Sequence, residues 1–262
     1  MCLVLFNWMQ HPAYRLVLAA NRDEFYARPT AAASFWDDAP HVLAGRDQEA
    51  GGTWMGVTRG GRWAAITNYR EPDRHRPDAP SRGQLVARYL SGHISPQTYA
   101  RVVNEQGDAY NGFNLLLGTP ASLYYVSNRG GDRRRVEPGH HGLSNHLLDT
   151  GWPKVERGRR KLRRALDQDS VKAPHLLDLL YDTAQPDDEA LPETGIGLAG
   201  ERLLSPMFIA SSDYGTRAST VLLIGRDGRA TFAERTYDGG DPVGEHHFSF
   251  EVDPSAADVP HA

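Results

Sequence analysis

The chain begins with two short apolar runs separated by a polar turn that contains a proline. The runs cover residues 2–8 and 14–20. Apolar runs of this length that are bounded by turn residues are typical of β-strands, so the sequence predicts an N-terminal hairpin. A second hairpin is predicted over residues 53–58 and 62–68, because an Arg-Gly-Gly turn joins these runs.

Helical spacing dominates the middle of the chain, and strands return at its end. Residues 71–80 read as an exposed loop, after which Ser81 is expected to cap a helix that reaches about Gly92. A second helix is expected to start at Ser95 and Pro96, with the serine as N-cap. Further helices are predicted over 152–169 and 174–181, a loop over 184–200, and strands over 113–117, 123–127, 220–224, 229–236 and 245–252.

Strands at both ends with helices between them indicate an α+β fold in which helices pack on antiparallel sheets. These elements need one another to bury their apolar faces. We therefore expect a single domain over residues 1–254, followed by a frayed tail over residues 255–262.

Charge and composition narrow the classes of function. The net charge of −4 over 262 residues gives no field that favours nucleic acid. No run of about 18 apolar residues occurs, so no transmembrane helix is expected. A single cysteine allows no disulfide within the chain, and the start does not resemble a signal peptide, so a cytoplasmic location is predicted. The oligomeric state is left open.

The single cysteine, Cys2, follows the initiator Met1 directly. A small residue at this position permits removal of Met1, which would leave a thiol and a free α-amine on one residue. The α-amine titrates near pH ~8 and a thiol near ~8.5, so the amine can serve as the base for the thiol. The alternative is a buried cysteine that only fills space at the start of a strand.

A charged cluster, Asn21-Arg22-Asp23-Glu24, ends the second predicted strand. In a hairpin the end of the second strand lies beside the beginning of the first, so Arg22 or Asp23 should lie within reach of Cys2. An arginine there would favour the thiolate or hold a substrate oxygen, and a carboxylate would orient the α-ammonium. The alternative is a surface Asp–Arg pair of small energetic value.

Several motifs together resemble the NRDE family, also called the transport-and-Golgi-organisation family, over residues 1 to about 237. The resemblance rests on the start Met1-Cys2, the cluster at residues 21–24, and matches at 51–56, 67–70, 81–83, 111–115, 142–145 and 214–219. It implies ligand-binding roles for Asn21, Glu24, Trp54 and Asn114. The family is associated with haem mobilisation, lipid or acyl-CoA homeostasis and secretory-pathway organisation.

The chain start also resembles N-terminal nucleophile hydrolases of the choloylglycine hydrolase and penicillin V acylase type. This resemblance implies a four-layer αββα sandwich. It also implies Cys2 as nucleophile, Asn145 or its competitor Asn68 as oxyanion donor, and Arg217 beside Arg22 and Asp23 in the pocket. The order Asn-Arg-Asp differs from that group's usual Arg-Asn-x-Asp, so the roles within residues 21–24 stay open.

Two functions therefore follow from the sequence. The first is a cysteine amidohydrolase or thioesterase that acts on a small acyl ligand and requires no cofactor. The second is a non-catalytic chaperone that carries haem, lipid or acyl-CoA in the same pocket. No metal site is predicted, because the paired histidines at 140–141 and 246–247 lack the i, i+4 spacing of ligands on one helix face.

Overall fold

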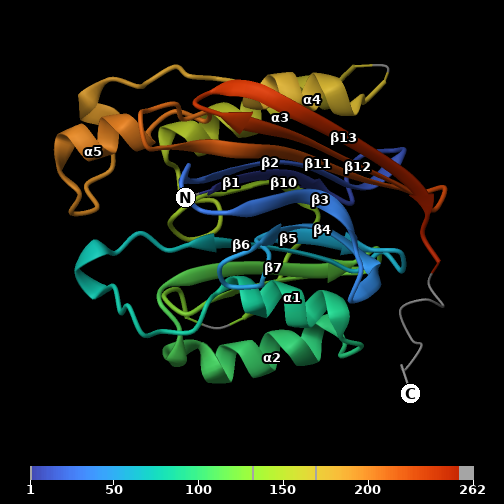
Figure 1. The fold of residues 1–262 in the computed structure, drawn as a ribbon. Helices are drawn as coiled ribbons and strands as arrows, with labels where there is room; N and C mark the ends of the chain where they lie inside the picture. The colour runs from blue at the N-terminus through green and yellow to red at the C-terminus, as the bar shows by residue number, and fades with distance from the viewer. Residues whose placement is uncertain (1, 132, 169, 254–262) are drawn as a thin grey trace.

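The computed structural model describes residues 2–131, 133–168 and 170–253, and it shows two antiparallel sheets stacked face to face (Figure 1). Within these ranges one sheet has the order β10-β1-β2-β11-β12-β13 and the other has the order β3-β4-β5-β6-β7-β8-β9. The strands of the first sheet are β1 (Cys2–Trp8), β2 (Tyr14–Phe25), β10 (Gly139–Leu143), β11 (Tyr214–Gly225), β12 (Arg229–Asp238) and β13 (Asp241–Glu251).

The second sheet and the helices complete the four layers. Its strands are β3 (Thr30–Trp36), β4 (Ala39–Asp47), β5 (Met55–Thr58), β6 (Trp63–Asn68), β7 (Phe113–Thr119), β8 (Ser122–Ser127) and β9 (Arg134–Arg135). The α-helices are α1 (Gly83–Ser91), α2 (Pro96–Gln106), α3 (Pro153–Leu166), α4 (Ala173–Leu180) and α5 (Gly197–Leu204). The expected αββα sandwich is confirmed. The single domain over residues 1–254 stays a prediction, and the tail at 255–262 lies outside the described residues.

Strand β1 shows why the N-terminal run is apolar from Cys2 to Phe6. Val4 and Phe6 belong to the core between the two sheets, whereas Leu3 and Leu5 pack against the helices on the outer face. Successive side chains of a strand point to opposite faces, so a strand covered on both faces needs apolar residues throughout.

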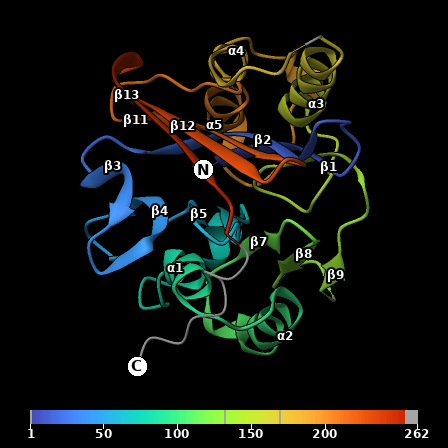
Figure 2. The same cartoon turned by 90° about the vertical axis from the view of Figure 1, so that its right-hand side faces the viewer.

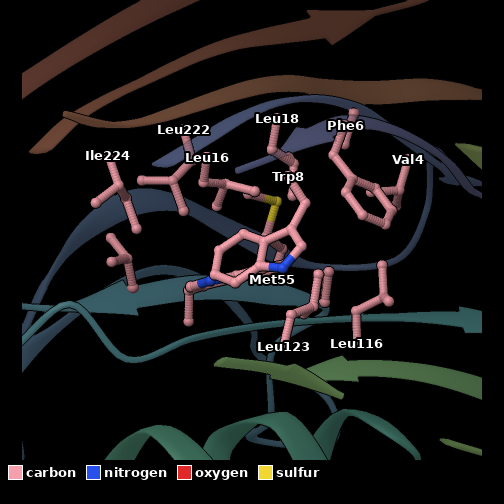
Figure 3. Packing of buried hydrophobic residues seen from close by; sticks show 14 of the residues in the cluster. Val4, Phe6, Trp8, Leu16, Leu18, Met55, Leu116, Leu123, Leu222 and Ile224 are labelled. Atoms are coloured by element: carbon pink, nitrogen blue, oxygen red, sulfur yellow. The ribbon is translucent and has the colours of Figure 1, made fainter. Parts of the chain in front are cut away.

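The core between the sheets fills the middle of the sandwich (Figure 3). Figure 3 shows side chains from β1, β2 and β11 meeting side chains from the opposite sheet, among them Met55, Leu116 and Leu123. All three of these residues are at most 1% exposed. Burial of this extent supplies the main stabilisation of the sandwich and leaves a ligand site only beyond this packed region.

The helices cover the two outer faces (Figure 2). Helices α1 and α2 pack on the seven-stranded sheet through residues that include Leu85, Val86 and Val103. Helices α3 and α4 pack on the six-stranded sheet through residues that include Leu162 and Leu177. Within the described ranges no helix is long and apolar enough to span a membrane.

The first helix differs from its prediction at its start. Helix α1 begins at Gly83, and its N-cap is Arg82, which makes no side-chain cap bond, so the expected cap at Ser81 is wrong. The backbone of Gly52 lies close to this helix start: a Cβ on Gly52 would lie 2.6 Å from the carbonyl carbon of Gly83. The cap at Ser95 is confirmed, because its side chain accepts a hydrogen bond from the N–H of Thr98.

Elements that the sequence pattern did not predict include strand β10, which pairs with β1. Strands β3 and β4 form a hairpin over residues 30–47, and helix α5 starts at Gly197 inside the expected loop 184–200. The β3 segment alternates imperfectly and contains three consecutive alanines, so its periodicity is weak. The pairing between β3 and β4 is also irregular in register.

Candidate active site

Strand β2 carries the charged cluster directly past the start of β1. Cys2 pairs with Arg22 in antiparallel register, and on the other side of β2 the residues Thr216 and Ala218 of β11 pair with Asp23 and Arg22. The expectation that the strand ends at residue 20 is wrong, because β11 provides backbone partners as far as Phe25. The cluster is therefore part of the sheet and held on both sides.

A cavity of about 720 Å³ opens beside the start of β1, at the end of the sandwich toward which the segment after β6 projects (Figure 1). This volume is within the range of small-molecule sites. Seven of the residues predicted from the sequence line it: Cys2, Arg22, Asp23, Glu24, Trp54, Asn68 and Arg217.

The Cys2 thiol lies at the wall of this cavity and is 8% exposed. Burial raises the pKa of the thiol, while the backbone N–H of Asp23, which donates to the sulfur, and the nearby Arg22 guanidinium act in the opposite direction. Because the net effect is a raised pKa, the thiol is protonated at neutral pH. A nucleophilic role for Cys2 therefore requires a base.

Asp23 is buried beside Cys2, and burial raises the pKa of its carboxyl group. The hydroxyl of Thr216 donates to its Oδ1 over 2.8 Å. Lys154 at the start of α3 also attracts this carboxylate. Burial lowers the pKa of Lys154 to about 8, and its Nζ donates to the carbonyl of Leu204. Asp23 thus lies between the cavity and a buried cation of the helix layer.

The two candidate oxyanion donors occupy different positions. Asn68 lines the cavity, whereas Asn145 is fully buried and does not. The Nδ2 of Asn145 donates to the carbonyl of Asn68 over 2.9 Å. The neighbouring Ser144 hydroxyl donates to the carbonyl of Cys2 over 3.0 Å. Asn145 thus holds the end of β6 in place through the Asn68 carbonyl, whereas Asn68 itself lines the cavity.

Arg217 lies at a bulge of β11, between the pairs that join Thr216 and Ala218 to β2. Its Nη1 donates to the carbonyls of Phe25, Tyr26 and Arg28. Arg217 therefore holds the turn that follows β2 and presents the rest of its guanidinium at the cavity wall.

Two of the four predicted binding residues lie away from the cavity. Asn21 is fully buried and faces the helix layer, where its Nδ2 donates to the carbonyls of Leu180 and Met207. Asn114 is fully buried between the sheets, where its Oδ1 accepts from the Tyr125 hydroxyl. Glu24 and Trp54 line the cavity.

Glu234 also lines the cavity and was not predicted from the sequence. It lies on β12 and is 3% exposed. Its Oε1 accepts the backbone N–H of Ala33 from the opposite sheet over 2.6 Å. A signal was present: Glu234 shares the parity of Ala230 and Phe232, so strict alternation places a carboxyl group on the buried face.

A pH-dependent loss of stability is expected from Glu234. Burial raises its pKa from 4.5 to about 7. Between these two values the unfolded chain loses the proton while the folded chain keeps it, so stability falls as pH rises through this window. The loss amounts to about 3 kcal/mol above pH 7.

Glu234→Gln should remove this pH-dependent loss of stability. The free energy of unfolding of the variant, measured in urea, should therefore rise relative to that of the wild type as the pH increases from 4.5 to 7. Asp238→Asn, at the exposed end of the same strand, is the control. Equal pH dependence in wild type and Glu234→Gln would contradict this assignment.

Comparison with known proteins identifies the family. Residues 1–239 match Transport and Golgi organisation 2. The chain belongs to this family. A Bos taurus Transport and Golgi organization protein 2 homolog is 40% identical, with 93% of this chain and 95% of that protein covered. The Homo sapiens homolog is 36% identical, with 90% and 93% covered.

A solved structure shares the fold over nearly the whole chain. A mutant of conjugated bile acid hydrolase from Clostridium perfringens is similar, with a TM-score of 0.50 and 9% identity, over 97% of this chain and 98% of that chain. At this identity the likeness concerns the fold alone.

Proposed function

We propose that this chain is a cysteine N-terminal nucleophile amidohydrolase or thioesterase that acts on a small acyl ligand. One observation carries the proposal: Cys2 lies at the wall of a cavity of about 720 Å³, directly opposite Arg22 in the strand register. Asp23 and Asn68 line the same cavity. The chemistry that these residues can perform together is acyl transfer to sulfur.

Removal of Met1 would supply the base that a protonated thiol needs. The α-amine of Cys2 takes the thiol proton as sulfur attacks the carbonyl carbon, and the carbonyl oxygen becomes an oxyanion. The side-chain amide of Asn68 donates to that oxygen; such a donor contributes about 2.7–4 kcal/mol to transition-state stability. As the bond to nitrogen or sulfur breaks, the α-ammonium returns its proton to the leaving group.

Water then completes the cycle. The α-amine removes a proton from water, which attacks the acyl-thioester and releases a carboxylic acid and free Cys2. Asp23 accepts a hydrogen bond from the α-ammonium and keeps it oriented throughout. Arg22 and Arg217 provide positive charge at the wall and balance the negative charge that develops on the substrate.

Turnover of matched acyl substrates tests this proposal. The chain, with its N-terminus verified by intact mass, should hydrolyse hexanoyl-p-nitroanilide or the thioester S-hexanoyl-N-acetylcysteamine. Preference between the two shows whether the leaving group is an amine or a thiol. Absence of hydrolysis of both compounds and of their longer and shorter acyl homologues, in a chain that lacks Met1, would contradict the proposal.

A second candidate function is binding without turnover, in the cytoplasm, of haem or of a lipid or acyl-CoA. The observation that favours it is the raised pKa of the buried Cys2 thiol, which disfavours a thiolate. His75 lines the cavity and offers a side chain that can ligate haem iron. Titration with haemin should then shift the Soret band at micromolar protein; an unshifted band would contradict haem binding.

A further inference from the structure

Two buried charged groups face the cavity without forming an ion pair with each other. Arg22 is 6% exposed and Glu234 is 3% exposed, and both line the cavity. They attract each other electrostatically, but the guanidinium and the carboxylate do not approach within the 4.0 Å of an ion pair. Arg22 lies on β2 and Glu234 on β12, and these strands are not neighbours because β11 lies between them.

The Nη1 of Arg22 is buried and has no hydrogen-bond partner within residues 2–131, 133–168 and 170–253. Its Nη2 forms an ion pair with Oε2 of Glu24 at 3.8 Å, which is beyond hydrogen-bond distance. On the other wall, Glu234 is fixed by the Ala33 N–H at Oε1. A buried charged donor without a partner costs free energy, so the arrangement favours a ligand group that satisfies it.

The strand between the two groups contributes Ala218, which pairs with Arg22, and Thr220, which pairs with Glu234. Ala218 pairs with Arg22 on one side and with Thr236 on the other, so it lies on β11 between the strands of Arg22 and Glu234. Strands lie about 4.8 Å apart, which puts the two backbones about 10 Å from each other. Opposite the carboxylate is Gly45, where even a Cβ would come within 3.6 Å of Oε2 of Glu234.

We infer that Arg22 and Glu234 together bind a neutral polar group of the acyl ligand, a hydroxyl or an amide, by a bridge in which Arg22 donates to it and Glu234 accepts from it. A hydroxyl or amide supplies both an acceptor and a donor, as the two walls require. A carboxylate would meet Glu234 and an ammonium would meet Arg22, so the opposed charges select against both.

This inference rests on the proposed function only in that the same cavity receives an acyl chain. The reacting carbonyl lies at Cys2 on β1, and the bridge lies across the sheet toward β12. Arg22 lies one strand spacing from Cys2 and Glu234 lies three, so the middle of the bridge is roughly 10 Å from Cys2. The ligand is therefore expected to carry its polar group several carbon atoms away from the carbonyl.

Binding of a matched pair of fatty acids to the Cys2→Ala chain tests the bridge without any turnover. By calorimetry at pH 8, above the pKa of about 7 of Glu234, 10-hydroxydecanoate should bind at least about ten-fold more tightly than undecanoate, which has a methyl group in place of the hydroxyl. Glu234→Leu in the same background should bring this ratio close to one. Thr236→Val, which removes a hydroxyl from the same wall of β12, should leave the ratio intact.

Three results would overturn the inference. Equal affinities for the two acids in the Cys2→Ala chain would show that solvent alone bridges Arg22 and Glu234. An equal loss of affinity for both acids in Glu234→Leu would show a structural role for the carboxyl group. Failure of both acids to bind would exclude an acyl subsite there. Each of these is separable from failure of the proposed hydrolysis, which is measured with Cys2 present.

Discussion

Replacement of Cys2 by alanine is expected to abolish covalent labelling by acyl electrophiles and to lower turnover by on the order of 10³-fold or more. Sulfur is the atom that the proposal places against the substrate carbonyl, and the described residues contain no other cysteine. Labelling and hydrolysis are measured by mass spectrometry and by release of p-nitroaniline.

Cys2→Ser separates the nucleophile from the shape of the cavity. A hydroxyl is close in size to the thiol but is far harder for an α-amine to deprotonate, so turnover should remain low although ligand binding persists. Wild-type rates in either variant would place the chemistry elsewhere in the chain. Loss of ligand binding together with turnover in Cys2→Ser would indicate a packing role.

Replacement of Asn21 by alanine is expected to destabilise the fold by about 3 kcal/mol or more. Its side chain donates to the carbonyls of Leu180 and Met207 and accepts from the hydroxyl of Ser219, all in buried positions. Alanine would leave these three groups without that partner. Urea unfolding measures the change.

Ser219→Ala is the matched control for Asn21, because it removes only the hydroxyl that donates to Asn21 Oδ1. It should cost about 1 kcal/mol. Little change in stability in Asn21→Ala, together with a large loss of ligand affinity, would instead support the binding role that the family resemblance implies for Asn21.

The placement of the nucleophile could be predicted because it depends on one hairpin. A turn after Trp8 brings residue 22 back to residue 2 whatever the rest of the fold does, and the register of β1 and β2 pairs these residues. The αββα layers were predictable with the help of a resemblance, since apolar runs alone do not state which strands share a sheet.

The rest of the site could not be predicted because distant segments build it. Glu234 reaches the cavity through two intervening strand pairings and is fixed by Ala33 of the other sheet. Asn21 and Asn114 have the residue type of binding groups, but the direction of each side chain depends on strand parity and on the layer that covers it. The alternation of side chains along a strand can be read from the sequence, but which layer packs on each face of the strand cannot.

The most direct test is intact mass of the chain after rapid quenching with an acyl thioester substrate. The account predicts a protein without Met1 that gains the mass of one acyl group, and peptide mapping that places this group on Cys2. A chain that retains Met1 and still turns over the substrate, or an acyl group on any other residue, would contradict it.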